Sequence, residues 1–134
     1  MRTPSQTAGP FFSIGLSRRP QNELRGGSLA LRGRVLDGEA APVADALVEL
    51  WDAELGFGRC ATDASGEFSF QLPPNARSFE VMVFARGLLK PVLTRLYLPG
   101  EAAEDETMVA RVEGDGLRFD VHLQGERETA FFEL

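Results

Sequence analysis

The apolar residues of this chain come in short alternating runs, and no stretch repeats apolar positions at the i, i+3, i+4 spacing of a long helix. Fourteen glycines and eight prolines interrupt these runs. Alternation between apolar and polar residues sets one face of a strand against a core and leaves the other open. The sequence therefore predicts an all-β fold, an antiparallel β-sandwich of about eight strands with an extended N-terminal arm.

Turn-forming residues separate the expected strands. Asp37 and Gly38 end the first run, and the turns 63–66 and 113–116 each contain a glycine that can close a short hairpin. The first of these two turns is expected to join runs 59–62 and 68–72 as hairpin partners. Run 79–85 is apolar on both faces except at Glu80, which favours a central strand covered on each side over an edge strand. The expected strands are 29–35, 46–53, 59–62, 68–72, 79–85, 92–98, 109–112, 117–123 and 129–132.

A chain of 134 residues suits a single domain with one core. We divide it into an N-terminal arm and linker, residues 1–28, and a sandwich, residues 29–134. Prolines and glycines exclude a regular ladder or helix from the arm, yet Phe11, Phe12 and Ile14 are too apolar to be left in water. Burial of each Phe contributes about 1.5–3 kcal/mol. The arm is therefore expected to lie against a surface, either its own sandwich or another chain.

Charge and composition exclude several classes of function. The net charge of -6 and the pI near 4.8 argue against nucleic-acid binding, which relies on clustered Lys and Arg. Cys60 is the single cysteine, so no internal disulfide can form and a reducing compartment is expected. The first residues lack the apolar core of a signal peptide, and no run reaches the roughly 20 apolar residues of a membrane span. These features predict a cytoplasmic protein without a membrane partner.

Several segments of the chain resemble a known family. They are TPSQTAGPFFSIGL (3–16), FARG (84–87), TRLYL (94–98), LRFDVHLQGE (117–126) and ETAFFEL (128–134). All are similar to the α chains of protocatechuate 3,4-dioxygenases, in the intradiol ring-cleavage dioxygenase family. Segments 31–53 and 58–70 resemble the first half of the sandwich core of that family, although their pattern also occurs in transthyretin-like and carboxypeptidase-regulatory-like sandwiches. The N-terminal segment is the specific one.

The resemblance implies a division of labour between two chains. A catalytic β chain holds ferric iron with two tyrosinates and two histidines, hard oxygen and imidazole donors that suit this metal. This chain has one Tyr and one His. Loop 54–57 and segment 73–77, where the resemblance places the two tyrosines, contain none, and the two histidine positions are Ser78 and Glu80. We therefore expect no metal site and no catalytic residue in this chain, and Fe(III) in a β-type partner.

The resemblance also implies a pocket-wall role for part of the arm. It places Thr7, Ala8, Gly9, Pro10 and Phe11 against the partner's substrate, and Phe11 departs from the tyrosine common in the family. Arg86, in the FARG segment, is expected near the mouth of the site, where a guanidinium favours a carboxylated substrate. An equally good interpretation of Arg86 is an arginine held by a salt bridge at a strand end.

The leading hypothesis is thus an iron-free, alpha-type subunit in aromatic catabolism through the β-ketoadipate pathway. The complex would cleave an aromatic acid, protocatechuate, with O2 to 3-carboxy-cis,cis-muconate, and this chain alone would be inactive. The alternative is a noncatalytic transthyretin-like or carboxypeptidase-regulatory-like interaction module. The sequence leaves open the stoichiometry, the exact substrate, and whether loops shortened after Trp51, Leu72 and Leu98 leave a functional subunit or a degenerate one.

The remaining polar residues are expected to be structural. His122 alternates with apolar neighbours, so it faces solvent or an interface together with Asp120 and Gln124. The hydroxyl of Tyr97 is expected to anchor a strand edge, and Cys60 to fill space in a strand. Asp37 and Asp63 are expected to cap backbone groups in their turns.

Overall fold

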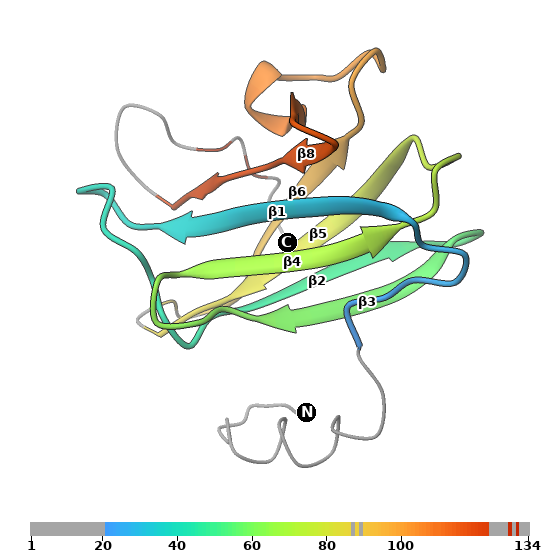
Figure 1. Ribbon diagram of the computed structural model, residues 1–134. Helices are drawn as coiled ribbons and strands as arrows, with labels where there is room; N and C mark the ends of the chain where they lie inside the picture. The colour runs from blue at the N-terminus through green and yellow to red at the C-terminus, as the bar shows by residue number, and fades with distance from the viewer. Residues whose placement is uncertain (1–20, 87, 89, 124–128, 130, 132–134) are drawn as a thin grey trace.

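The computed structural model describes residues 21–86, 88, 90–123, 129 and 131. Two β-sheets pack face to face, with β1 and β4 in front of β2, β3 and β5 in the view of Figure 1. The elements are β1 (Leu29–Leu36), β2 (Leu47–Asp52), β3 (Gly56–Ala61), β4 (Glu67–Leu72), β5 (Ser78–Phe84), β6 (Val92–Tyr97), the 3-10 helix η1 (Glu106–Met108), β7 (Arg111–Glu113), β8 (Gly116–Arg118) and β9 (Val121–His122). No helix in this part of the chain is long and apolar enough to span a bilayer.

The predicted β-sandwich is confirmed. One sheet has the order β4-β1-β8-β7, with β9 also paired to β1, and the other has the order β3-β2-β5-β6. Most neighbours are antiparallel, but β1 runs parallel to both β8 and β9. Strand β5 lies between β2 and β6, so its predicted central position is confirmed, but Glu80 and Phe84 on its outer side are exposed in the described part of the chain.

The core lies between the sheets and is made of the inward residues of each strand. The largest side chains that are almost fully buried are Phe70 and Phe79, one from each sheet. Alternation explains their burial, because β4 and β5 each direct every second residue inward. Others that pack with them are Leu31, Val35, Val48, Leu50, Leu72, Val81, Val83, Leu96 and Val121.

The expected hairpin between runs 59–62 and 68–72 is wrong. Strand β3 pairs with β2, whereas β4 pairs with β1 over six residue pairs, so the two strands lie in different sheets. The turn between them contains the expected features: Asp63 Oδ1 accepts from the amides of Ser65 and Glu67, and Gly66 has a φ of +74°. A tight turn fixes only the local reversal of the chain, and here that reversal carries the chain across the core from one sheet to the other.

The expected strand 117–123 is interrupted. It divides into β8 and β9 at Phe119 and Asp120, where a carboxylate replaces the missing ladder contact. Asp120 Oδ1 accepts from the backbone N–H of Arg34 at 3.0 Å and from Arg118 Nε at 3.0 Å. Asp120 is partly exposed between the buried Phe119 and Val121, as the alternation predicted, and its carboxylate is also bound to β1.

The C-terminal strand expected at 129–132 is not present at the residues described there. Thr129 and Phe131 lie outside any strand. Thr129 nevertheless contacts β9 closely, since its N–H donates to His122 O at 2.9 Å and its hydroxyl accepts from His122 N at 2.8 Å. Residues 130 and 132 lie outside the described part.

Residues 21–24 close one open edge of the sandwich, where β3 and β4 end the two sheets. The N–H of Arg59 in β3 donates to Gln21 O at 2.9 Å, and the N–H of Gln71 in β4 donates to Asn22 O at 2.8 Å. Leu24 is buried at the same edge. This segment therefore ties the two sheets together and fixes the point from which the N-terminal arm departs.

Candidate functional site

The side of the β3-β2-β5-β6 sheet that faces away from the core carries Ser78 and Glu80, the positions where the resemblance places two iron-binding histidines. We call this side the outer face. Strand register and the burial of alternate residues define its members: Leu47, Glu49 and Trp51 of β2, Phe57, Arg59 and Ala61 of β3, Ser78, Glu80, Met82 and Phe84 of β5, and Leu93, Arg95 and Tyr97 of β6.

Ser78 and Glu80 both lie on the outer face, two residues apart on β5. Cross-strand pairing places Ser78 opposite Tyr97 and Glu80 opposite Arg95. Glu80 is also paired with Trp51 on the other side. The positions that the resemblance assigns to two iron-binding histidines are therefore next to each other on one surface, with a guanidinium beside them.

A polar cluster at the edge strand β6 occupies the same end of the outer face. The hydroxyl of Tyr97 donates to Glu104, and Arg95 NH1 lies 3.3 Å from the Tyr97 hydroxyl and 3.2 Å from Glu104 Oε2. The hydrogen bond from Tyr97, with a smaller contribution from the nearby Arg95, lowers the pKa of Glu104. The hydrogen bond that Arg95 NH1 donates to the Tyr97 hydroxyl is the main cause that raises the pKa of Arg95. The expected anchoring of Tyr97 at a strand edge is confirmed.

These residues do not fit a ferric ion. The centre that the resemblance implies would need two tyrosinates and two imidazoles, whereas this end of the outer face presents Ser78, Glu80 and a single tyrosine whose hydroxyl is bound to Glu104. Arg95 adds a positive charge where a cation would have to sit. His122 lies in β9 of the opposite sheet. Across the described residues no group of three or more His, Cys, Asp or Glu side chains could hold a metal ion.

A second ion pair lies in the middle of the outer face. Arg59 NH2 and Glu49 Oε2 are 2.8 Å apart, and both side chains are largely buried. The guanidinium of Arg59 also stacks over the ring of Phe57 at 5.1 Å from its centroid. Burial raises the pKa of Glu49, and the charge of Arg59 opposes that effect only in part.

Replacement of Glu49 with glutamine should remove part of the free-energy cost of burying the charged carboxylate. The pKa of Glu49 is higher in the folded chain than its ordinary value of 4.5, so the folded state binds the proton more tightly than the unfolded state. The free energy of unfolding of the wild type should therefore fall relative to Glu49→Gln as the pH rises from below 4.5 to 7. Urea unfolding at both ends of that range measures the difference, with the exposed Glu54→Gln as the control. A difference independent of pH would contradict the prediction.

A shallow hollow of about 330 Å³ lies at the β2–β3 turn. It is lined by Arg25, Ala53, Glu54, Leu55, Gly56 and Phe57. Asp52 Oδ2 accepts from the amides of Glu54 and Leu55, and Gly56 has a φ of +99°, so the turn is as tight as the short sequence predicts. This turn is the loop in which the resemblance places the first iron-binding tyrosine, and it contains no tyrosine.

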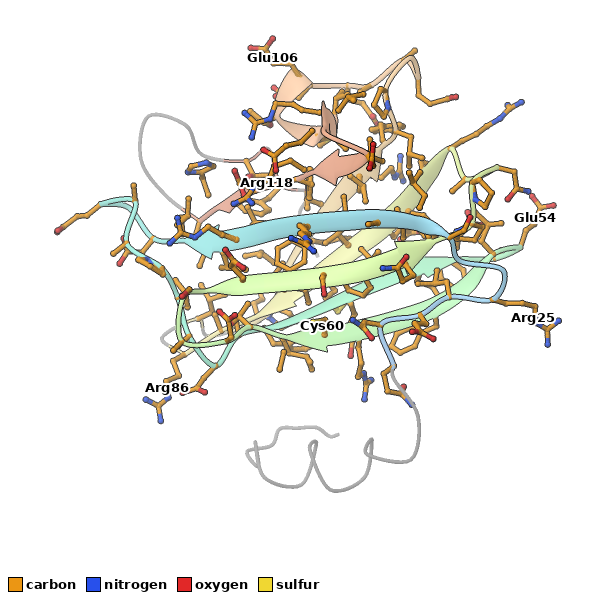
Figure 2. All side chains as sticks on the ribbon, viewed as in Figure 1. Arg25, Glu54, Cys60, Arg86, Glu106 and Arg118 are labelled. Atoms are coloured by element: carbon orange, nitrogen blue, oxygen red, sulfur yellow. The ribbon has the colours of Figure 1, made fainter. Side chains whose placement is uncertain are left out.

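Arg86 lies just beyond β5, and its side chain is exposed. Figure 2 shows it directed away from the sandwich, at the opposite end from Arg25 and Glu54. Within the described part of the chain Arg86 makes no ion pair, so the salt-bridged interpretation gains no support. The arm residues Thr7, Ala8, Gly9, Pro10 and Phe11 lie outside the described residues, and their role in a pocket wall stays a prediction.

Three other expectations concern side chains away from the outer face. Asp37 Oδ1 accepts from the amides of Glu39 and Ala41, which confirms a capping role. Cys60 is half-buried in β3, and burial raises the pKa of its thiol. His122 is half-buried in β9 and contacts Thr129 through its backbone. None of these residues lies next to Ser78 or Glu80.

The exposed aromatic residues of the outer face were not predicted as functional. Trp51, Phe57 and Phe84 are 48%, 43% and 36% exposed. The signal in the sequence was the alternation in β2, which puts Trp51 on the side opposite the buried Val48 and Leu50. Alternation alone does not reveal whether that second side is covered.

Comparison with known proteins identifies the family. The chain is 31% identical over 193 aligned positions to the protocatechuate 3,4-dioxygenase alpha chain of Pseudomonas putida, and the alignment covers 98% of this chain and 96% of that protein. It belongs to this alpha-chain family of intradiol dioxygenases. The alpha chain of Burkholderia cepacia is 27% identical, with 99% of this chain and 98% of that protein covered. No protein-family model matches the chain.

Solved structures agree with the family assignment. The dioxygenase domain of a dioxygenase and carbohydrate-binding protein fusion from Streptomyces sp. SirexAA-E has a TM-score of 0.61 and 26% identity, over 92% of this chain and 98% of that chain. Catechol 1,2-dioxygenase from Pseudomonas arvilla C-1 shares the fold, with a TM-score of 0.58 and 20% identity over 97% of this chain and 63% of that chain.

This member of the alpha-chain family is short. The alignment with the Pseudomonas putida chain runs over 193 positions, whereas this chain has 134 residues. The relative therefore contains inserted residues that this chain lacks, in agreement with the shortening expected from the sequence. The β2–β3 turn is short, because β2 ends at Asp52 and β3 begins at Gly56.

Proposed function

We propose that this chain is the iron-free, alpha-type subunit of a protocatechuate 3,4-dioxygenase. It binds a beta-type chain that holds Fe(III), and its arm residues Thr7 to Phe11 together with Arg86 form part of the wall of the partner's substrate pocket. The complex opens the ring of protocatechuate and incorporates both atoms of O2 to give 3-carboxy-cis,cis-muconate. This chain contributes pocket wall and assembly, and the metal chemistry belongs to the partner.

The replaced ligand positions carry this proposal. Ser78 and Glu80 lie on the outer face, and Glu80 is paired across strands with Arg95. A surface that combines this guanidinium with a single phenol cannot supply a two-tyrosinate, two-imidazole site. The fold of the family is kept around these positions. Retention of the fold without the ligand set is what a supporting subunit requires.

Co-expression with a beta-type chain tests the proposal. The purified chain alone should be colourless, hold no stoichiometric iron and consume no O2 with protocatechuate. Co-expression should give a complex by size-exclusion chromatography, with iron, visible tyrosinate-to-iron absorption and O2 uptake. Iron binding and turnover by this chain alone would overturn the assignment. Failure to form any complex would favour the noncatalytic interaction module.

Replacement of Arg86 with glutamine should weaken recognition of the substrate carboxylate. Loss of one charge-assisted hydrogen bond corresponds to roughly a tenfold increase in the KM for protocatechuate in the complex. The KM for catechol, which lacks the carboxylate, should change little. Because Arg86 is exposed, thermal unfolding should be unaffected. Arg25→Gln, at the other end of the sandwich, is the matched control, and an unchanged KM for protocatechuate would remove Arg86 from the pocket wall.

A further inference from the structure

The outer face has the character of a covered surface. Of the four large apolar side chains that are exposed in the described part of the chain, Trp51, Phe57 and Phe84 all lie on it, and Val112 lies elsewhere on β7. Trp51 and Phe57 are cross-strand partners at one end of the face, and Phe84 lies at the other end, opposite Leu47.

Two carboxylates on or beside this face are paired within the chain, since Glu49 binds Arg59 and Glu104 binds Arg95. The third, Glu80, lies opposite Arg95 across the strands. A face with exposed aromatic side chains at both ends and ion pairs between them is suited to burial against another segment.

The N-terminal arm begins at the rim of this face. Gln21 accepts a hydrogen bond from the N–H of Arg59, in the strand that borders the outer face. Leu24 is buried behind it and fixes the direction of the chain. In Figure 1 the described chain starts beside β3. Twenty further residues precede Gln21, and all of them originate from this edge.

The sequence of the arm matches an extended segment with one apolar side. Phe12, Ile14 and Leu16 alternate with Ser13, Gly15 and Ser17. In an extended conformation residues i, i+2 and i+4 point to the same side, so the three apolar side chains would form a single ridge. Phe11 would then point to the opposite side, away from any surface that the ridge contacts.

The arm is long enough to reach every strand of the face. Leu16 lies five positions before Gln21, and five steps of an extended chain span up to about 17 Å. Four strands spaced about 4.8 Å apart make a face about 14 Å wide. The ridge can therefore lie over Trp51, Phe57 and Phe84 while Gln21 stays bound to β3.

We propose that the outer face is the docking surface for this chain's own arm, with Phe12, Ile14 and Leu16 packed against Trp51, Phe57 and Phe84. This contact would hold residues 12–16 against the sandwich, and residues 7–11 would extend beyond it. Of the two surfaces expected to cover the apolar arm, its own sandwich or another chain, the proposal selects its own sandwich. The docking of the arm does not depend on the proposed dioxygenase role, although it would present Phe11 and its neighbours to a partner in a fixed position.

Trp51 provides a direct reporter, because it is the single tryptophan of the chain and lies on the outer face. The triple variant Phe12→Ser, Ile14→Ser, Leu16→Ser should shift the emission of Trp51 to longer wavelength. Its acrylamide quenching constant should rise roughly twofold, since removal of the ridge uncovers an indole that is about half exposed on the bare face. The double variant Ser13→Ala, Ser17→Ala changes the other side of the segment and should behave as the wild type.

The competing occupants give different results. Equal quenching in the triple variant and the wild type would overturn the proposal. Protection of Trp51 that disappears on dilution of the wild type would assign the face to a second copy of the chain instead. Protection seen only after a beta-type chain is added would assign it to that partner. Cooperative thermal unfolding of each variant shows that a change in quenching reflects the arm and not loss of the fold.

Discussion

Gly33→Ala should remove the native state or lower the free energy of unfolding by at least about 4 kcal/mol, which is a large part of the stability of an ordinary domain. A Cβ at this position would lie 1.8 Å from the backbone oxygen of Phe119 and 2.6 Å from the ring of Phe68. The carbonyl cannot move away easily, because the N–H of Phe119 donates to Arg32 O and Asp120 binds the N–H of Arg34. Glycine is therefore required at position 33 of β1, where the backbone of Phe119, between β8 and β9, lies against it.

Urea unfolding followed by circular dichroism measures the effect. Gly114→Ala is the control, because Gly114 has a φ of +60° and open space around its missing Cβ. Left-handed strain alone costs about 1–2 kcal/mol there. Similar losses in the two variants would show that the contact between Gly33 and Phe119 is not restrictive.

Phe79→Ala should lower the free energy of unfolding by about 3–5 kcal/mol, the second largest effect expected among these variants. Phe79 is 1% exposed and lies between Ser78 and Glu80 on β5, with its ring in the core. Truncation removes buried apolar area and leaves a cavity that the two packed sheets cannot close. Because β5 is the central strand under the outer face, the fold and the candidate site depend on the same side chain.

Phe84→Ala is the matched control for this substitution. It removes the same atoms from the same strand, but Phe84 is 36% exposed and faces outward. A smaller loss of about 1–2 kcal/mol is expected, which includes the proposed contact with the arm, because Phe84 lies outside the core. Denaturant midpoints of the two variants, compared at equal m-values, isolate the contribution of burial. Equal losses would mean that the core does not close around Phe79.

Much of the candidate site could be predicted because it depends on composition. One Tyr and one His cannot form a two-tyrosinate, two-imidazole centre in any fold, and the sequence alone excluded this iron site. The structure adds that Glu80 faces Arg95 and that Tyr97 binds Glu104. These contacts join residues of different strands and loops, so no local pattern reveals them.

By itself, the sequence determined the β class, the central position of β5 and the capped turns at Asp37 and Asp63, because alternation, apolar content and turn chemistry are local properties. Only the tertiary structure decided that β3 and β4 belong to different sheets, that the chain breaks at Asp120 beside Gly33, and that Trp51, Phe57 and Phe84 share one exposed face. Those outcomes depend on which strands pair. Strand pairing is decided by packing between residues distant in the chain, and two-residue periodicity carries no information about it.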